Sequence, residues 1–80
     1  MGIKQAIVNK LKKLCKERGI TINTLANISG VTPSTVYSIM DNSRKDIGVV
    51  VLKKLCDGLG ITITEFFDDK LFKNLEQEII

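Results

Sequence analysis

The chain has 80 residues, a formal net charge of +3 and 44% hydrophobic residues, a composition that suits one small folded domain and is too apolar for a disordered chain. No apolar run approaches the roughly 20 residues of a membrane-spanning helix, and the N-terminus lacks the apolar core of a signal peptide, so we expect a cytoplasmic protein with no membrane partner. The chain has no histidine, and its two cysteines, Cys15 and Cys56, lack the spacing of a metal site, which leads us to expect buried thiols, no metal, no cofactor and no enzymatic activity.

Residues 3–18 predict the first helix. Its apolar residues recur every three or four positions, which places them on one face of a helix: Ile3, Ile7, Leu11 and Leu14. Lysines occupy the other side. Gly19 then ends the helix, because glycine adopts the left-handed conformation of a helix C-terminus without steric cost.

Two short helices follow, and each has a threonine at its start. Thr21 carries a hydroxyl that can cap the first of them, which ends at Gly30. Thr32 caps the second, and Pro33 suits its first position because no backbone N–H is needed there. The second helix reaches about Met40, and the polar segment that comes next predicts a solvated loop over residues 41–46.

A fourth helix is predicted over about residues 48–58. The run Val49–Val51 resembles a strand, but the apolar residues continue in helical spacing through Leu52, Leu55, Cys56 and Leu59. We therefore favour a helix that ends at Gly58 or Gly60. The segment Thr62-Ile63-Thr64-Glu65 matches a capping box and opens a fifth short helix. The predicted fold class is all-α.

Residues 70–80 form a last amphipathic segment, which we expect to be a short helical tail after a domain of residues 1–69. Its apolar residues exceed what a solvated tail needs, and they are the candidate dimer interface: Leu71, Phe72, Leu75, Ile79 and Ile80. The alternative is that this segment folds back onto the core of its own chain.

Charge is distributed unevenly along the chain. Residues 1–54 carry ten Lys/Arg and three Asp/Glu, whereas residues 55–80 carry two lysines and six acidic residues. A basic front half suits a protein with one surface that faces an anion such as nucleic acid. The alternative is an ordinary solvated lysine face on the first helix, and charge alone does not decide between the two.

Residues 22–41 carry the spacing of a helix-turn-helix unit. Two short helices joined by a tight turn pack closely only when the residue at their crossing point is small, and Ala26 supplies that residue. Gly30, four residues later, supplies the turn. Val36, six residues after the glycine, fills the gap between the helices.

With this unit the sequence resembles the Cro/C1-type (XRE-type) helix-turn-helix transcriptional regulators over about residues 5–68. The resemblance is carried by the motif and by the two helices that follow it, through Ile20-Thr21, Leu25-Ala26, Gly30-Val31-Thr32, Val36, Ile39, Leu52, Leu55, Leu59-Gly60-Ile61 and Phe66-Phe67. It implies a five-helix, lambda-repressor-like domain whose third helix enters the major groove of double-stranded DNA.

The resemblance also implies which residues meet DNA. The third helix would face the groove, and helical spacing independently puts positions 34, 37 and 38 on one face. Phosphates would lie at the N-termini of the second and third helices, where free N–H groups and the helix dipole favour anions, and at the loop after the third helix. The expected DNA-contacting residues are Thr21, Asn23, Thr32, Pro33, Ser34, Tyr37, Ser38, Asn42, Ser43, Arg44 and Lys45.

The departures from the family pattern include two positions that would face DNA. Ile22 stands where members often carry a glutamine that touches DNA, and Pro33 stands at the first position of the third helix, where a polar side chain is usual. The serines of this helix also read base edges less specifically than Arg, Gln or Asn does. We therefore expect a shallow sequence preference.

The leading interpretation is a sequence-specific DNA-binding transcriptional regulator. We expect a repressor that binds two half-sites as a homodimer, with no small-molecule effector. The alternative is a protein-interaction module on the same fold, an antitoxin or an adaptor that docks a partner through the tail. The weak base-reading residues and the acidic end of the chain favour this alternative, and salt-dependent affinity for DNA discriminates between the two.

Overall fold

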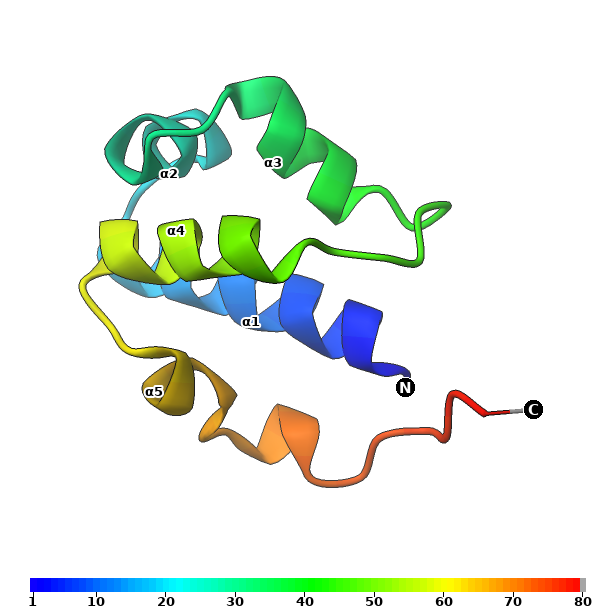
Figure 1. Ribbon diagram of the computed structural model, residues 1–80. Coiled ribbons are helices and arrows are strands. Elements are labelled where there is room, and N and C mark those ends of the chain that lie inside the picture. Colours follow the sequence, from blue (N-terminus) through cyan, green and yellow to red (C-terminus); the bar gives the residue numbers. More distant parts are fainter. Residues whose placement is uncertain (80) are drawn as a thin grey trace.

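Five α-helices and one short 3₁₀-helix follow one another along the chain in the computed structural model, which describes residues 1–79 (Figure 1). No strand occurs among these residues, so the predicted all-α fold is confirmed, and none of their helices is long and apolar enough to cross a membrane. The elements are α1 (Ile3–Arg18), α2 (Ile22–Ser29), α3 (Pro33–Met40), α4 (Val49–Leu59), α5 (Ile63–Phe67) and the 3₁₀-helix η1 (Lys70–Phe72).

Threonine side chains begin three of these helices, as the sequence predicts. Thr21, Thr32 and Thr62 each accept a hydrogen bond from the backbone N–H three residues further on. At α5 the capping is reciprocal, because the Glu65 carboxylate accepts a hydrogen bond from the N–H of Thr62 at 2.9 Å. The bonds from Thr62 favour the ionised carboxylate and lower the pKa of Glu65. Local chemistry therefore sets the start of α2, α3 and α5.

Glycines end α1, α2 and α4. Gly19, Gly30 and Gly60 have φ angles of 63°, 70° and 71°, a left-handed conformation that strains any residue with a Cβ. Of the two candidates for the end of α4, Gly60 is therefore the terminator. Gly58 lies inside the helix, where it faces α2.

Every α-helix contributes a large, fully buried side chain to one apolar core: Leu11 from α1, Leu25 from α2, Val36 from α3, Leu55 from α4 and Phe66 from α5. Ala26 and Val36, which the motif places at the crossing of α2 and α3, are completely buried. Helix α2 packs against both α3 and α4, so the helix-turn-helix unit is anchored on α4.

Both cysteines are buried and neither forms a disulfide, as expected. Cys15 lies on α1 and Cys56 on α4. Burial raises the pKa of each thiol, because the thiolate loses hydration in an apolar surrounding. The two thiols are therefore poor nucleophiles in the folded protein.

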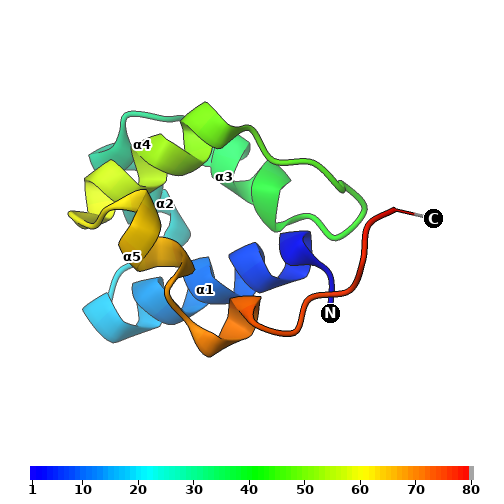
Figure 2. The same cartoon turned by 60° about the horizontal axis from the view of Figure 1, so that its bottom comes forward.

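The expected helical tail is much shorter than the sequence suggested. One turn of 3₁₀-helix covers Lys70–Phe72, and residues 73–79 form no regular helix (Figure 2). Helices shorter than about 12–15 residues are marginal without tertiary packing. Glu76 and Glu78 would also lie near the negative C-terminal end of such a helix. The apolar spacing of residues 70–80 therefore did not suffice to make a helix, and Ile80 lies outside the described residues.

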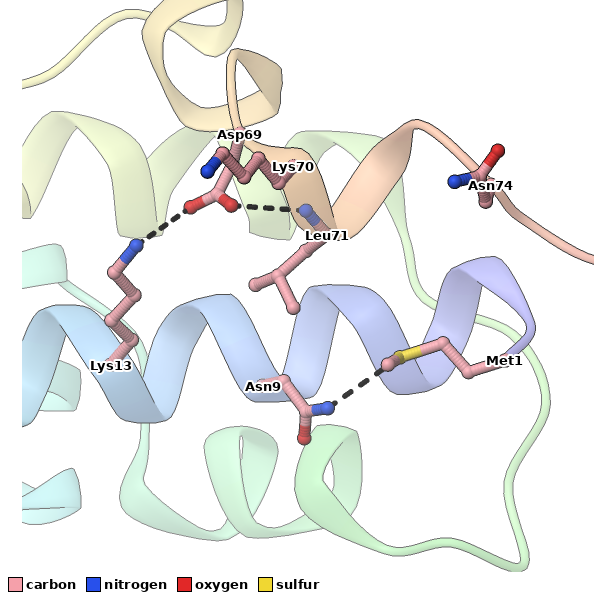
Figure 3. A pocket seen from close by; sticks show the side chains of 7 residues that line it. All are labelled: Met1, Asn9, Lys13, Asp69, Lys70, Leu71 and Asn74. Atoms are coloured by element: carbon pink, nitrogen blue, oxygen red, sulfur yellow. Dashed lines mark hydrogen bonds and ion pairs between the residues drawn. The ribbon is translucent and has the colours of Figure 1, made fainter.

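An ion-pair cluster fastens the start of the tail to α1. Asp69 accepts a hydrogen bond from the ammonium group of Lys10 at 2.8 Å. The same oxygen accepts from the ammonium group of Lys13 at 3.0 Å, and its other oxygen accepts the N–H of Leu71 at 3.0 Å (Figure 3). The side chains of Lys10 and Asp69 are only 10% and 9% exposed. Asp69 is thus both the N-cap of η1 and the link between η1 and α1.

Candidate nucleic-acid interface

One face of α3 is polar and exposed. Ser34 and Tyr37 are exposed, Tyr37 to 55%, whereas Val36 and Ile39 on the opposite face are buried in the core. Ser38 is partly buried beside them. Helical spacing predicts this division, and Figure 1 places α3 on the side of the molecule opposite the tail. The helix is therefore free to meet a macromolecule along its polar face.

The N-termini of α2 and α3 differ in what they offer an anion. The hydroxyl of Thr21 accepts the N–H of Thr24 at 3.1 Å, and the hydroxyl of Thr32 accepts the N–H of Thr35 at 3.3 Å. Pro33 has no N–H to donate, so α3 presents fewer free backbone donors than α2. Asn23 is exposed in the first turn of α2. Helix α2 thus offers more free backbone donors at its N-terminus than α3 does.

The loop after α3 is a tight turn with two exposed cations, which we call the basic turn (residues 41–45). The N–H of Arg44 donates to the carbonyl of Asp41 at 3.1 Å. The Asp41 carboxylate accepts from both the N–H and the hydroxyl of Ser43, at 2.9 and 2.8 Å, and these bonds lower the pKa of Asp41. Arg44 and Lys45 are exposed, and neither has an ion-pair partner within residues 1–79.

A shallow groove joins α3 to the basic turn. It has a volume of about 250 Å³ and is lined by Thr35 and Ser38 of α3, by Arg44, and by residues at the start of α4. The structure thus brings together two predicted site residues, Ser38 and Arg44, that are six positions apart in sequence. Thr35 was not among the DNA-contacting residues predicted from the sequence, although its position three residues before Ser38 puts both on one face of the helix.

The other side of the basic turn faces the N-terminus of α1 and the tail. Asn42, Arg44 and Lys45 line a second groove together with Lys4 of α1 and residues 76–78 of the tail. Lys4 donates hydrogen bonds from its ammonium group to the carbonyl of Asp41 at 3.1 Å and to that of Arg44 at 2.9 Å. Lys4 is not predictable as part of this surface from the sequence, because its hydrogen-bond partners lie 37 and 40 positions away.

Of the residues predicted for a dimer interface, the four that the structure describes do not form one exposed surface. The Phe72 ring packs on the core, 5.9 Å from Phe66 and 4.8 Å from Phe67 between ring centroids. Leu71 and Leu75 are partly buried, and Ile79 is 80% exposed. The alternative that the segment folds back on its own chain is therefore correct for Phe72.

A third groove lies between α1 and the tail. It has a volume of about 550 Å³, and its lining includes Asn9, Lys13, Asp69 and Leu71 (Figure 3). Much of its polar lining is already engaged, since Asp69 is held by Lys13 and by the N–H of Leu71. No residue of α3 or of the basic turn lines it, so it does not belong to the interface of α3 and the basic turn.

Comparison with known proteins gives three similarities. The family model of the Cro/C1-type HTH DNA-binding domain matches residues 10–70. Control protein C.MunI from Mycoplasma sp is 37% identical over 67 residues, which cover 84% of this chain and 90% of that protein. The crystal structure of the prophage Lp1 protein 11 is similar with a TM-score of 0.81 and 26% sequence identity, covering 94% of this chain and 100% of the other.

Proposed function

The chain belongs to the family of Cro/C1-type helix-turn-helix DNA-binding domains, and we propose that it controls transcription by placing α3 in the major groove of double-stranded DNA. The family is described by DNA binding and not by a reaction. In this proposal the exposed face of α3 contacts base edges, and the N-terminus of α2 and the basic turn contact phosphates.

The observation that carries the proposal is the exposed polar face of α3 together with the basic turn, which line one groove. Ser34 and Tyr37 point away from the core, and Ser38 lines one groove with Arg44. An α-helix with its side chains is about 10–12 Å wide, which matches the major groove of B-DNA. The cations beside the helix suit the phosphates that border that groove.

Phosphate contacts should supply most of the affinity. Hydroxyl groups from Ser34, Tyr37 and Ser38 discriminate bases less strongly than bidentate Arg or Asn contacts do. Ser34 and Thr32 also share a hydrogen bond between their hydroxyls at 3.1 Å. We therefore propose modest sequence preference on top of a strong electrostatic term.

Replacing Arg44 and Lys45 together by alanine is expected to weaken binding to random-sequence duplex DNA. The slope of log K against log[salt] should become shallower by about 1.8, because each neutralised phosphate contributes about −0.9. Fluorescence anisotropy at several salt concentrations measures both quantities. The matched control is Lys12→Ala/Lys16→Ala, which removes two exposed cations from α1 and should leave the slope unchanged.

Two outcomes would contradict the proposal. If the folded wild-type protein does not bind duplex DNA at low salt, the protein-interaction alternative is favoured. If the α1 control lowers the slope as much as the change in the basic turn does, binding depends on total charge and not on this surface.

We propose repression as the direction of control. Occupying a site that overlaps a promoter reduces transcription through DNA binding alone, and the relative from Mycoplasma sp is named a control protein. Sites selected from random duplexes, placed over the promoter of a reporter gene, test this point. Reduced expression in the presence of the protein supports repression, and increased expression overturns it.

We also propose that the protein binds as a homodimer, because one helix-turn-helix unit contacts too few base pairs for high specific affinity. Leu75 and Ile79 of the tail are the proposed contacts, together with Leu71, while Phe72 supports them from the core. The start of α4 carries another exposed apolar pair, Val49 and Val50, at 73% and 65% exposure.

Placing charges in the tail is expected to separate the subunits. The variant Leu75→Glu/Ile79→Glu should raise the dimer dissociation constant at least about tenfold, because burying unpaired carboxylates is costly. Sedimentation equilibrium measures the constant. The matched control is Val49→Glu/Val50→Glu, where acidic residues suit the first turn of a helix. If only Val49→Glu/Val50→Glu raises the dimer dissociation constant, the interface lies at the start of α4 instead.

A further inference from the structure

We propose that Lys4 is a positioning residue for the basic turn, holding it in the conformation that presents Arg44 and Lys45 to DNA. The inference rests on the proposed function and adds to it a residue of α1, outside the helix-turn-helix unit. It is carried by two hydrogen bonds that join the first turn of α1 to Asp41 and Arg44, the two ends of the four-residue segment 41–44 within the basic turn.

Hydrogen bonds within the basic turn define its shape. A further backbone bond connects the turn to α3, at the N-terminal end of the turn. The N–H of Arg44 donates to the carbonyl of Asp41, and Ser43 donates twice to the Asp41 carboxylate. The N–H of Asp41 donates to the carbonyl of Ser38 at 3.3 Å, at the end of α3. All residues from 41 to 46 are exposed, so the first side chain to reach the core beyond the turn is that of Ile47.

Lys4 supplies the missing attachment. Its ammonium group donates to the carbonyl of Asp41 at 3.1 Å and to that of Arg44 at 2.9 Å. These are the first and last carbonyls of residues 41–44, so one cation links both ends of that segment to α1. Bonds from a charged donor are stronger than those between neutral groups.

This attachment matters for binding because it acts before DNA arrives. A surface turn that is mobile in the free protein must be ordered when it binds, and that cost reduces affinity. Because Lys4 bonds the carbonyls of Asp41 and Arg44, the backbone that carries the side chains of Arg44 and Lys45 already has a defined position before DNA binds. Lys4 therefore increases affinity through order and does not need to touch a phosphate itself.

The variant Lys4→Met removes the donors and keeps the length of the side chain. We expect the affinity for duplex DNA to fall about three- to tenfold, the effect of ordering one or two further groups on binding. The salt slope should stay unchanged, because Arg44 and Lys45 still neutralise their phosphates in the complex. In the free protein, NMR order parameters of residues 42–45 should fall from rigid values near 0.85 toward 0.6.

Two variants test whether the effect is specific to the charge at position 4, and an unfolding measurement tests whether each variant is folded. Lys12→Met makes the same chemical change at an exposed position of α1, so it should alter neither the order parameters nor the salt slope. Lys4→Arg keeps the cation and its donors and should restore most of the affinity. Denaturant unfolding confirms that every variant compared is folded under the binding conditions.

The outcomes separate three cases. A fall in order parameters and affinity at constant slope supports the positioning role. Unchanged order parameters with a slope shallower by about 0.9 would overturn it and make Lys4 a phosphate contact. If wild-type protein fails to bind DNA, the proposed function is wrong, while the order parameters still decide whether Lys4 holds the turn.

Discussion

Replacing Asp69 by alanine is expected to lower the free energy of unfolding by about 3 kcal/mol, the usual cost of leaving a buried charge without its partner. Lys10 would keep its ammonium group in a place where the side chain is only 10% exposed. The N–H of Leu71 would lose its acceptor, and η1 its N-cap. Chemical denaturation followed by circular dichroism measures the change.

Two further variants show whether the ion pair is the cause. Asp68→Ala removes the neighbouring, exposed carboxylate and should change stability by less than about 0.5 kcal/mol. Lys10→Met combined with Asp69→Ala removes both charges of the buried pair and should recover much of the loss, because an apolar pair can replace an ionic one. A large effect of Asp68→Ala would contradict this assignment.

The same cluster makes stability depend on pH. The hydrogen bond from Lys10, the N–H of Leu71 and the bond from Lys13 hold the pKa of Asp69 well below its ordinary value of 3.8. Since the folded pKa is lower than the unfolded one, the stabilisation is complete above about pH 4 and is lost as the pH falls through the folded pKa. Unfolding curves of Asp69→Asn should therefore be less sensitive to acid below pH 4 than those of wild type.

Replacing Gly58 by alanine is expected to destabilise the protein by about 2 kcal/mol through overpacking. A Cβ at this position would lie 3.0 Å from the Cα of Ser29 and 3.1 Å from its Cβ, and closer still to its hydroxyl. Alanine favours a helix interior over glycine by about 1 kcal/mol, so the predicted loss is net of that gain. Thermal or chemical unfolding measures it.

Ser29 allows a matched test of this contact. Its hydroxyl is buried and has no hydrogen-bond partner among the described residues, so Ser29→Ala should be neutral or stabilising by up to about 1 kcal/mol. Gly48→Ala adds a Cβ that meets only Val51 at an ordinary 3.8 Å, and it should cost less than about 1 kcal/mol. If Gly58→Ala costs no more than this control, α2 and α4 have room that the structure does not show.

The effect of Gly58→Ala should extend to DNA binding. Helix α2 packs on α4 and α3 packs on α2, so a wider spacing between α2 and α4 tilts the whole helix-turn-helix unit. The basic turn would be displaced with α3, because it begins directly after that helix and only residues 46–48 join it to α4.

Helix boundaries were predictable because they are set by chemistry within a few residues. Thr21, Thr32 and Thr62 cap helices whose starts they mark in sequence, and Gly19 and Gly30 end two of them. The exposed face of α3 follows from helical spacing in the same way. These features need no knowledge of what lies on the other side of the molecule.

The remaining features depend on contacts between distant segments. The attachment of the basic turn by Lys4 and the pairing of Lys10 with Asp69 join residues 37 to 59 positions apart, and neither lysine differs in sequence from its exposed neighbours on α1. For the tail the prediction was wrong in the opposite sense, because a helix was predicted that residues 73–79 do not form. Its apolar spacing predicted a helix, but a segment this short is marginal without packing along its length, and the Phe72 ring packs on Phe66 and Phe67 from a single 3₁₀ turn.

The two buried cysteines allow local opening of the folded protein to be measured without an added label. A thiol reagent reaches Cys15 or Cys56 only when α1 or α4 separates from the core, so the rate of modification measures the free energy of that separation in native buffer. The two positions sample different helices. Helix α1 contacts the tail and holds the basic turn, whereas the helix-turn-helix unit packs on α4. Comparing the modification rates of the two cysteines tells whether α1 opens independently of α4 and that unit.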